Sequence, residues 1–465
     1  MTPPAGHATV PSTRPGGGPA RLTAGWQQMS RAATLSEHVA RYGPLPQAGR
    51  GSRRNHRMLA DAVTRAGLTG RGGAAFPTGT KIGAVAARRG PAVVVANGME
   101  SEPASEKDQA LLARAPHLVL DGAVLAAEAV RADAVYVCLS RSRPWQAGQL
   151  AAAVAERQAS RLDSVRIEIH DLPERYVASE ETALVHWLNG GEARPVNTPP
   201  RPSERGVGRR PTLVDNVETL AHIALIARYG PDWFRQAGTG EAPGTMLATI
   251  CGAVAGPGVY EIELGTLVVD ALAMAGASAE ASAVLIGGYF GTWHDAAAVA
   301  GLRLARPGLT QGGTAPASST APDSNTAPAS STSPGAGVLA VLPAGACGLT
   351  ETARVLGYLA AQSAGQCGPC VFGLSAIADD FAQLASGRPH GPVLDRLSRR
   401  LGVVSGRGAC RHPDGATRLA ASALGTFAAD ARAHAQRRSC QAAWRGRPAA
   451  PVLPIPRPDP DGRWR

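Results

Sequence analysis

Residues 67–103 read GLTGRGGAAFPTGTKIGAVAARRGPAVVVANGMESEP, and this stretch decides the fold of the first half of the chain. Its continuously apolar run at 92–96 lies between turn residues, a pattern typical of a strand buried on both faces. Further apolar runs lie at 134–139 and 165–169, and segments with helical periodicity lie at 108–131 and 145–161. Strands that alternate with helices predict a parallel sheet, so we expect an α/β domain over residues 36–240.

The remainder of the chain predicts two further domains. Residues 243–305 hold short strand candidates separated by Gly and Pro turns, and we expect a small β-rich domain over 241–306. Helical periodicity rich in Ala and Leu returns at 348–436, so we expect residues 337–436 to form a helical bundle.

Three segments lack the apolar residues that a packed core needs, and we expect them to be unstructured. They are 1–35, 307–336 and 437–465, and the middle one, a low-complexity insertion, contains TAPASST twice. The net charge of +11 is concentrated at the two ends of the chain. Residues 1–57 carry eight Arg against one acidic residue, whereas the chain between the ends is close to neutral. A nucleic-acid partner is therefore not expected.

The composition bounds the class of protein. At 465 residues, with 44% hydrophobic and 18% charged residues, the chain is too long for one small module and too apolar for global disorder. It has no run of about 18 apolar residues and no signal-peptide core, so we expect a cytoplasmic protein without direct membrane insertion. Seven cysteines, an odd and sparse number, favour metal or redox use over a disulfide framework.

The glycine-rich part of the quoted stretch predicts a phosphate-binding loop. Residues 67–79 place five glycines in thirteen positions, and Lys81, one of only two lysines, follows. Glycines let the backbone approach a ligand and turn N–H groups toward an anion, and a lysine adds a positive point charge. A loop with only a structural purpose is the alternative that the residues leave open.

Polar residues gather in three segments, 97–103, 176–182 and 211–219, of which the first two follow predicted strands. Ligands bind beyond the carboxyl ends of parallel strands. Carboxylates and amides there suit the hydroxyl groups of ribityl and ribose chains and a carboxamide. The carboxylates also repel an additional phosphate, which favours NAD over NADP. Solvated surface glutamates are the alternative.

The sequence Cys367-Gly-Pro-Cys370, with Cys410 forty residues on, is the strongest local signal for a metal centre. Two thiolates three residues apart can bind one centre, and a third supplies most of an iron–sulfur site. The CGPC motif also occurs in thioredoxin-type redox proteins, where it opens a helix after a strand. A zinc site with His412 is the third alternative.

Taken in order, these segments resemble the family of NADH- and FMN-binding flavoprotein subunits of respiratory NADH:quinone oxidoreductase (complex I), which includes diaphorase subunits of NAD-linked hydrogenases and formate dehydrogenases. The match runs over residues 42–427 and lies in GLTGRGGAAFPTGTK (67–81), NGMESEP (97–103), YVASEETAL (176–184), PTLVDNVETL (211–220), GPGVYEIELG (256–265), GGYFGTW (287–293) and QCGPC (366–370). The resemblance implies a Rossmann-like FMN-binding domain, a small β-grasp-like SLBB domain and a C-terminal helical bundle with a [4Fe–4S] cluster.

The resemblance also implies roles for individual residues. Lys81 is expected on the FMN phosphate, and Phe76 on the adenine of NADH. The other residues expected to bind NADH, through its ribose and nicotinamide parts, are Glu100, Glu102 and Glu181. The other residues expected to hold FMN are Gly70, Arg71, Gly72, Gly73, Asn97, Glu180 and Asn216, and those expected to hold the cluster are Cys367, Cys370 and Cys410.

The activity implied is that of an NADH dehydrogenase subunit. Hydride passes from NADH to FMN, and electrons then pass singly through the iron–sulfur centre to a ferredoxin-like or quinone-reductase partner, which can be part of a membrane-associated complex. No side chain is expected to act as an acid or base, because the cofactors carry the chemistry. A diverged, non-catalytic subunit that keeps the fold is the alternative, followed by a CGPC thiol-disulfide redox protein.

The chain departs from the family pattern at several positions. Ala364 stands where the family has a fourth cluster cysteine. The alternatives left open are a [3Fe–4S] centre, a [4Fe–4S] centre with a non-cysteine fourth ligand, and no cluster at all. Candidates for that ligand are Ser363 and His412. Residues that replace NADH contacts of the family are Met99, Ala84 and Thr198, and Asp215 replaces the first asparagine of a pair.

Overall fold

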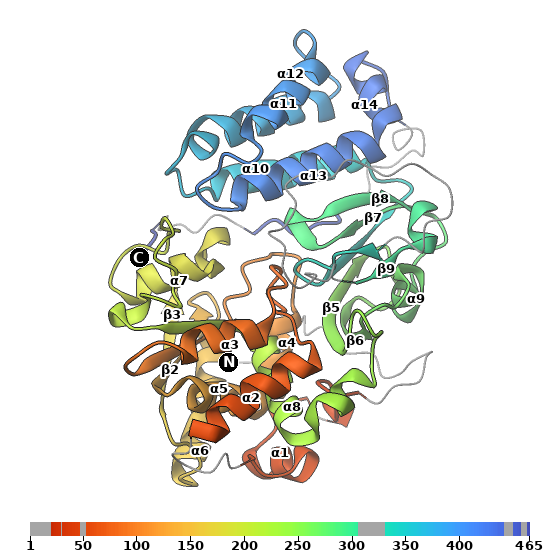
Figure 1. The fold of residues 1–465 in the computed structure, drawn as a ribbon. Coiled ribbons are helices and arrows are strands. Elements are labelled where there is room, and N and C mark those ends of the chain that lie inside the picture. Colours follow the sequence, from red (N-terminus) through yellow and green to blue (C-terminus); the bar gives the residue numbers. More distant parts are fainter. Residues whose placement is uncertain (1–19, 29, 47–52, 306–330, 441–449, 457–462) are drawn as a thin grey trace.

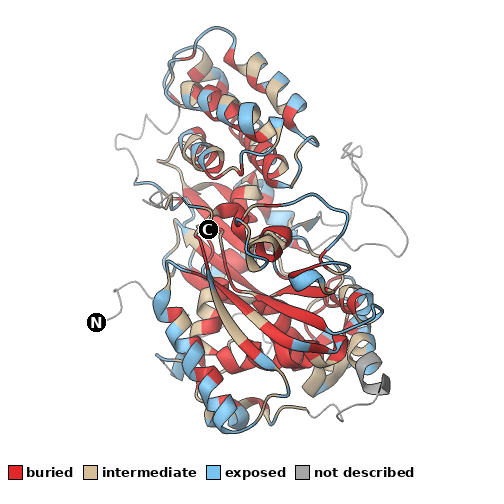
Figure 2. Ribbon diagram, turned by 90° about the vertical axis from the view of Figure 1, so that its left-hand side faces the viewer, coloured by how far each residue is buried: buried red, intermediate tan, exposed pale blue. Residues whose placement is uncertain are grey.

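The computed structural model describes residues 20–28, 30–46, 53–305, 331–440, 450–456 and 463–465. Figure 1 shows an α/β part at the bottom, a second sheet beside and above it, and a group of helices at the top. Figure 2 shows that buried residues fill the strands of the sheets, whereas exposed residues gather on the outer faces of the helices.

The α/β part is built on a four-stranded sheet with the order β3-β2-β1-β4, in which every neighbouring pair is parallel. Its strands are β1 (Ala92–Asn97), β2 (Ala132–Ser140), β3 (Arg166–Leu172) and β4 (Thr212–Asn216). The predicted parallel sheet is therefore confirmed. The apolar runs of the sequence correspond to β1, β2 and β3, whereas β4 lies in the polar segment 211–219, for which no strand was predicted.

Helices pack on this sheet and bury its apolar strands. The connections between strands contain α4 (Lys107–Arg114), α5 (Pro116–Val130), α6 (Pro144–Ala159) and α7 (Glu181–Leu188), and the other helices are α1 (Leu35–Tyr42), α2 (Arg53–Ala66), α3 (Thr78–Ala86) and α8 (Val217–Arg235). α5 is apolar and buried almost all round because it lies between the sheet and α8. Its Gly122 lies so close to α8 that an added Cβ would meet the Leu220 carbonyl oxygen at 1.8 Å.

The second sheet has five strands in the order β6-β5-β11-β7-β8. They are β5 (Thr245–Gly252), β6 (Gly258–Glu263), β7 (Ala281–Ile286), β8 (Thr292–Asp295) and β11 (Val338–Pro343), accompanied by the short helix α9 (Val268–Met274). The central position of β11 differs from the expectation that the helical domain begins at residue 337. Its sequence VLAVLP is almost fully buried because β5 and β7 cover both of its edges.

The low-complexity insertion is bounded by a small parallel pair. β9 (Arg303–Leu304) precedes it, β10 (Ser331–Thr332) lies near its end, and Ser331 pairs with Arg303. Residues 306–330, which hold most of the expected flexible segment, lie outside the described residues.

The C-terminal part is helical, as predicted. It contains α10 (Gly348–Ala361), a short π-helical turn at Pro369–Gly373, α11 (Leu374–Ala385), α12 (Val393–Val404), α13 (His412–Thr426) and α14 (Ala428–Ala435). Their apolar faces share one core with parts of the second sheet. Residues such as Phe381, Leu419 and Trp293 are buried in it.

The described parts of both terminal segments differ from the expectation of disorder. Leu22 is fully buried, and three successive backbone N–H groups, at Arg21, Leu22 and Thr23, donate to the Glu261 carboxylate. Near the other end, Leu453 is buried and Trp464 lies against the guanidinium groups of Arg175 and Arg194. A few large apolar side chains fix segments whose average composition predicts no packing. Residues 1–19 and 441–449 lie outside the described residues.

Among the described residues, no single helix is long and apolar enough to span a membrane. The pair α4 and α5 passes a test of length and composition together, but the two helices are bent by 96°.

The contact of α5 with α8 gives a test of the packing. Gly122→Ala places a methyl group against the Leu220 carbonyl, and we expect it to destabilise the protein by about 1–3 kcal/mol through overpacking. The matched control is Gly148→Ala in α6, where an added Cβ meets nothing within 4 Å and helix propensity favours Ala by about 1 kcal/mol. Chemical denaturation of both variants measures the difference. Equal stabilities would contradict the close approach.

Candidate functional site

The site is built where the carboxyl ends of β1 and β4 lie side by side. Their register pairs Asn97 with Asn216, and the Asn216 side-chain amide donates to the Asn97 carbonyl at 3.3 Å. The glycine-rich loop lies over this edge, because a Cβ on Gly72 would come within 3.3 Å of Asn216 Cβ. The structure thus brings together the loop and all three predicted polar segments, because the Asn97 side-chain amide also donates to the Ser179 carbonyl at 2.8 Å.

The glycine-rich loop is a tight turn that leads into α3. The Gly70 N–H donates to the Phe76 carbonyl at 2.9 Å, and the Thr78 N–H donates to Leu68 at 2.9 Å. Within the turn Gly73 has a φ of 103°, a conformation that favours glycine. The helix α3 begins at Thr78, directly after this turn.

Lys81 projects from α3 to the same edge. Its Nζ donates to the Val214 carbonyl and lies 3.1 Å from Glu181 Oε2 and 3.8 Å from Asp215 Oδ1. Burial lowers the pKa of Lys81, but the charges of Asp215 and Glu181 outweigh it, so the pKa is raised and the amine is cationic. Burial also raises the pKa of Asp215 to about 6, and its Oδ2 is buried without a hydrogen-bond partner.

The Arg71 side chain does not face this edge, although the resemblance placed Arg71 on FMN. Its guanidinium is 1% exposed and donates to the carbonyls of Thr245 and Thr69, and its Nε lies 3.9 Å from Glu218 Oε1. Burial lowers the pKa of Arg71 to about 10. The side chain therefore anchors the glycine-rich loop to α8 and β5.

A buried charge cluster around Glu218 supports the loop from behind. Lys107 Nζ lies 2.9 Å from Glu218 Oε2 and 2.6 Å from Asp108 Oδ1. The Leu247 N–H of β5 donates to Glu218 Oε1 at 2.8 Å. Burial raises the pKa of Glu218, but the nearby cations, Lys107 first, outweigh it and lower the pKa to about 2.

Sequence reasoning missed this cluster. Lys107 is the second of the two lysines of the chain, and that rarity is the signal that could have found it.

Two of the expected ligand-binding carboxylates cap helices. Glu100 accepts the N–H groups of Asp108 and Gln109 at the start of α4, at 2.9 Å each. Glu180 is the N-cap of α7 and accepts the N–H groups of Thr182 and Ala183 at 2.9 and 3.1 Å. Carboxylates are stabilising at helix N-termini, so these side chains set the positions of α4 and α7 beside the site.

Glu102 lies deeper, between the α/β part and the second sheet. Its Oε2 accepts the Tyr176 hydroxyl at 2.8 Å and the Tyr289 N–H at 2.9 Å. Burial raises the pKa of Glu102 to about 7, although these hydrogen bonds oppose the shift. Tyr176 and Tyr289 were not among the expected site residues.

Two of the positions expected on the nucleotide side, Phe76 and Glu181, are more exposed than Glu100 and Glu102. Phe76 is 43% exposed, an unusual position for a large aromatic side chain, and the Glu181 side chain is 40% exposed beside Lys81. Ala84 and Thr198 are exposed, whereas Met99 is 1% exposed and packs in an apolar cluster with Val95, Cys138 and others. Met99 therefore lies in the core rather than on the open side of the site.

The three cysteines come together at the start of α11 and α13. Cys367 accepts hydrogen bonds from Cys370 and from the N–H of Ala409, the neighbour of Cys410. Burial raises the pKa of Cys367, but these hydrogen bonds outweigh it and lower the pKa overall. Burial raises the pKa of Cys370 to about 12. The element before the motif is the helix α10, whereas a thioredoxin-type motif follows a strand, so the structural setting of these cysteines differs from that alternative.

The fourth-ligand candidates differ in their surroundings. Ala364 is buried and offers no ligand, and Ser363 is partly buried. His412 Nε2 donates to the Leu359 carbonyl at 2.8 Å, and its Nδ1 is buried without a hydrogen-bond partner. Its ring packs against Tyr176, with centroids 5.7 Å apart, so the cysteine region and the Glu102 region share one aromatic contact.

A glycine-rich loop with a lysine at a parallel sheet edge, together with thiols gathered in a helical bundle, is typical of a flavoprotein that also holds an iron–sulfur centre. Three families match in the same order: the Nuo51 FMN-binding domain over residues 63–225, the SLBB domain over 247–288 and the NADH-ubiquinone oxidoreductase-F iron-sulfur binding region over 350–434. The FMN-binding, SLBB and iron–sulfur parts inferred from the resemblance are confirmed.

Relatives of similar length identify the family. The NADH-quinone oxidoreductase F subunit of Streptomyces coelicolor is 30% identical over 400 residues, which cover 81% of this chain and 83% of the relative. The corresponding protein of Mycobacterium tuberculosis is 30% identical over 396 residues, with 81% and 84% covered. The chain belongs to the family of NADH-quinone oxidoreductase F subunits.

Solved structures agree with this assignment. A chain of an NAD+-reducing [NiFe]-hydrogenase in the H2-reduced state superimposes with a TM-score of 0.71 at 28% identity. The match covers 82% of this chain and 62% of that chain, so this protein spans about three fifths of the hydrogenase chain's length.

The position of Lys81 predicts its effect on flavin binding. Lys81→Ala removes the cation that lies at the sheet edge beside Asp215 and Glu181, and we expect FMN to bind about 10- to 100-fold more weakly, the cost of a charged hydrogen bond. Flavin fluorescence titration measures the change. Arg88→Ala, at an exposed ion pair just beyond α3, is the control. Unchanged FMN affinity in Lys81→Ala would exclude the phosphate role.

The buried Glu102 predicts a pH dependence of stability. Its folded-state pKa of about 7 lies above the ordinary value of 4.5. Its stabilising contribution to the free energy of unfolding is therefore largest below pH 4.5 and is lost as the pH rises to about 7. The loss amounts to at most about 3 kcal/mol. We expect Glu102→Gln to lose less stability between pH 5 and pH 8 than the wild type does, as measured by chemical denaturation. The control is Glu192→Gln, at an exposed side chain, whose stability should change with pH as that of the wild type does. If the stability of Glu102→Gln fell as steeply with pH as that of the wild type, the raised pKa of Glu102 would be contradicted.

Proposed function

We propose that this chain is the NADH-oxidising subunit of an electron-transfer complex, in which FMN takes hydride from NADH and an iron–sulfur centre receives the electrons. The observation that carries the proposal is the glycine-rich loop with Lys81 at the joined ends of β1 and β4. That edge offers a glycine-rich backbone, a partly buried cation and the amides of Asn97 and Asn216.

The residues present fit a flavin mononucleotide. Gly72 leaves the loop without side-chain bulk beside Asn216, and Asp215 Oδ2 has a free buried lone pair at the same edge. In this proposal Lys81 and the loop that contains Gly70 and Gly73 hold the phosphate, while Asn97 and Asn216 hold the ribityl and ring part. Arg71, Glu180 and Glu100 act by positioning, since their side chains anchor the loop, α7 and α4.

The nicotinamide nucleotide approaches from the open side of this edge. Phe76 offers an exposed aromatic face on which an adenine can stack. Glu181 supplies acceptors for ribose hydroxyls and the carboxamide, and its charge disfavours the additional phosphate of NADPH. When bound, FMN supplies the conversion between two-electron and one-electron transfer.

In this proposal the cluster is held by Cys367, Cys370 and Cys410. His412, two residues after Cys410, is the candidate for the fourth ligand, because its Nδ1 is buried without a hydrogen-bond partner. The surface beside it fits a protein partner. Phe372 is 76% exposed and Val371 is 49% exposed, directly after Cys370. Exposed apolar residues beside a redox centre suit transient docking of an iron–sulfur protein, through which the chain would be peripheral to a membrane complex.

An anaerobic titration of the FMN-loaded protein with NADH, and separately with NADPH, tests the proposal. We expect NADH to bleach the flavin band and then the iron–sulfur absorbance, whereas NADPH does so at least tenfold less effectively. The Cys410→Ser variant should retain the flavin phase and lose the iron–sulfur phase, with Cys251→Ser as its control. Bound flavin that NADH does not reduce would overturn the proposal.

A further inference from the structure

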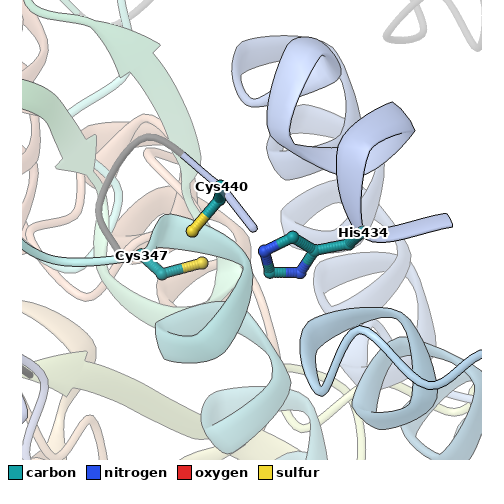
Figure 3. A group of neighbouring side chains, drawn as sticks. All are labelled: Cys347, His434 and Cys440. Carbon is teal, nitrogen blue, oxygen red and sulfur yellow. The ribbon is translucent and has the colours of Figure 1, made fainter. Parts of the chain in front are cut away.

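A second group of metal-ligating side chains lies in the helical bundle, apart from the cysteines discussed above. Cys347, His434 and Cys440 place their ligand atoms within 4.8 Å of one another. Figure 3 shows both sulfur atoms and the imidazole directed toward a common point. His434 and Cys440 are buried, and Cys347 is partly buried.

The three residues come from distant parts of the chain. Cys347 is the N-cap of α10, directly after β11, and His434 is in the last turn of α14. Cys440 follows α14. Nothing in the family resemblance or in the FMN and iron–sulfur chemistry uses them.

The His434 ring is oriented as a metal ligand requires. Its Nδ1 lies 3.0 Å from the Leu384 carbonyl oxygen at the end of α11. A carbonyl only accepts, so Nδ1 carries the proton and the Nε2 lone pair is left free. Metal-binding histidines are commonly fixed in this way by a backbone carbonyl on the second nitrogen.

Hydrogen bonds to the Cys347 sulfur partly offset the burial that raises the pKa of this thiol. Its sulfur accepts hydrogen bonds from the backbone N–H groups of Leu349 and Thr350 and from the Thr350 side chain. These are the free N–H groups of the first turn of α10, and the helix dipole there favours a negative charge. Two thiolates and one imidazole nitrogen are the soft and intermediate ligands that tetrahedral Zn2+ prefers.

We propose that Cys347, Cys440 and Nε2 of His434 bind one Zn2+ ion, with water in the fourth position. Two thiols lose their protons to solvent, and the two sulfur atoms and one nitrogen form bonds to the metal without any change of oxidation state. The ion would tie the segment after α14 to the junction of β11 and α10. It would therefore fasten the end of the bundle to the second sheet.

Metal analysis of the full-length protein, purified without chelators, tests the proposal. We expect about one zinc per chain in addition to iron. Cys347→Ala and Cys440→Ala should each lower bound zinc at least tenfold while FMN and iron content stay unchanged. The matched control is Cys251→Ala, because this free thiol lies in β5 and is not part of the group. The protein with this substitution should keep the zinc content of the wild type.

A cobalt titration keeps the test informative if a variant folds poorly. Co2+ added to the zinc-depleted wild type should give thiolate-to-metal charge-transfer absorbance, which His434→Ala weakens and the double alanine variant of Cys347 and Cys440 abolishes. Zinc content that is negligible, or equal in the wild type and the cysteine variants, would overturn the proposal. So would a Cys347–Cys440 disulfide in the native protein, found by mass spectrometry without reduction.

Discussion

The rest of the site depends on the contacts that the buried carboxylate of Glu218 makes. It is 1% exposed and joins Lys107 of α4, Arg71 of the glycine-rich loop and Leu247 of the second sheet. A buried charge of this kind is tolerated only when its partners stay in place, and loss of one partner costs about 3–5 kcal/mol. The loop is thus held by a carboxylate that also contacts the second sheet.

Much of the fold could be predicted from the local pattern of apolar residues. A strand buried on both faces shows as a continuous apolar run, and an amphipathic helix shows as apolar residues three to four positions apart. β1 and the C-terminal helices are of this kind. β4 and β11 were harder, since TLVDN contains functional polar residues and VLAVLP joins its sheet across a long insertion. The tail residues Leu453 and Trp464 show a further limit: a single large side chain can fix a segment whose composition predicts disorder.

The site could be predicted in its segments but not in its contacts. The sequence identified Lys81, Asn97, Asn216 and the three cysteines as candidates, and the structure gathers them in two places. It could not show that Glu100 and Glu180 cap helices, because a capping carboxylate and a ligand-binding carboxylate look alike in sequence. Nor could it show Cys347 beside Cys440, since that proximity arises only from the tertiary packing, in which α14 lies against α11, α12 and α13.

The position of β11 has a consequence for how the protein is made. β5 with β6 and β7 with β8 form separate antiparallel pairs, and β11 alone joins them. During synthesis the edges of β5 and β7 that β11 later covers stay unpaired until residues 338–343 have left the ribosome. The β9–β10 pair closes the insertion beforehand, and each doubling of such a loop costs only about 0.6 kcal/mol. The insertion can therefore vary in length among relatives at little thermodynamic cost, while it sets how long the nascent chain exposes those edges to chaperones and aggregation.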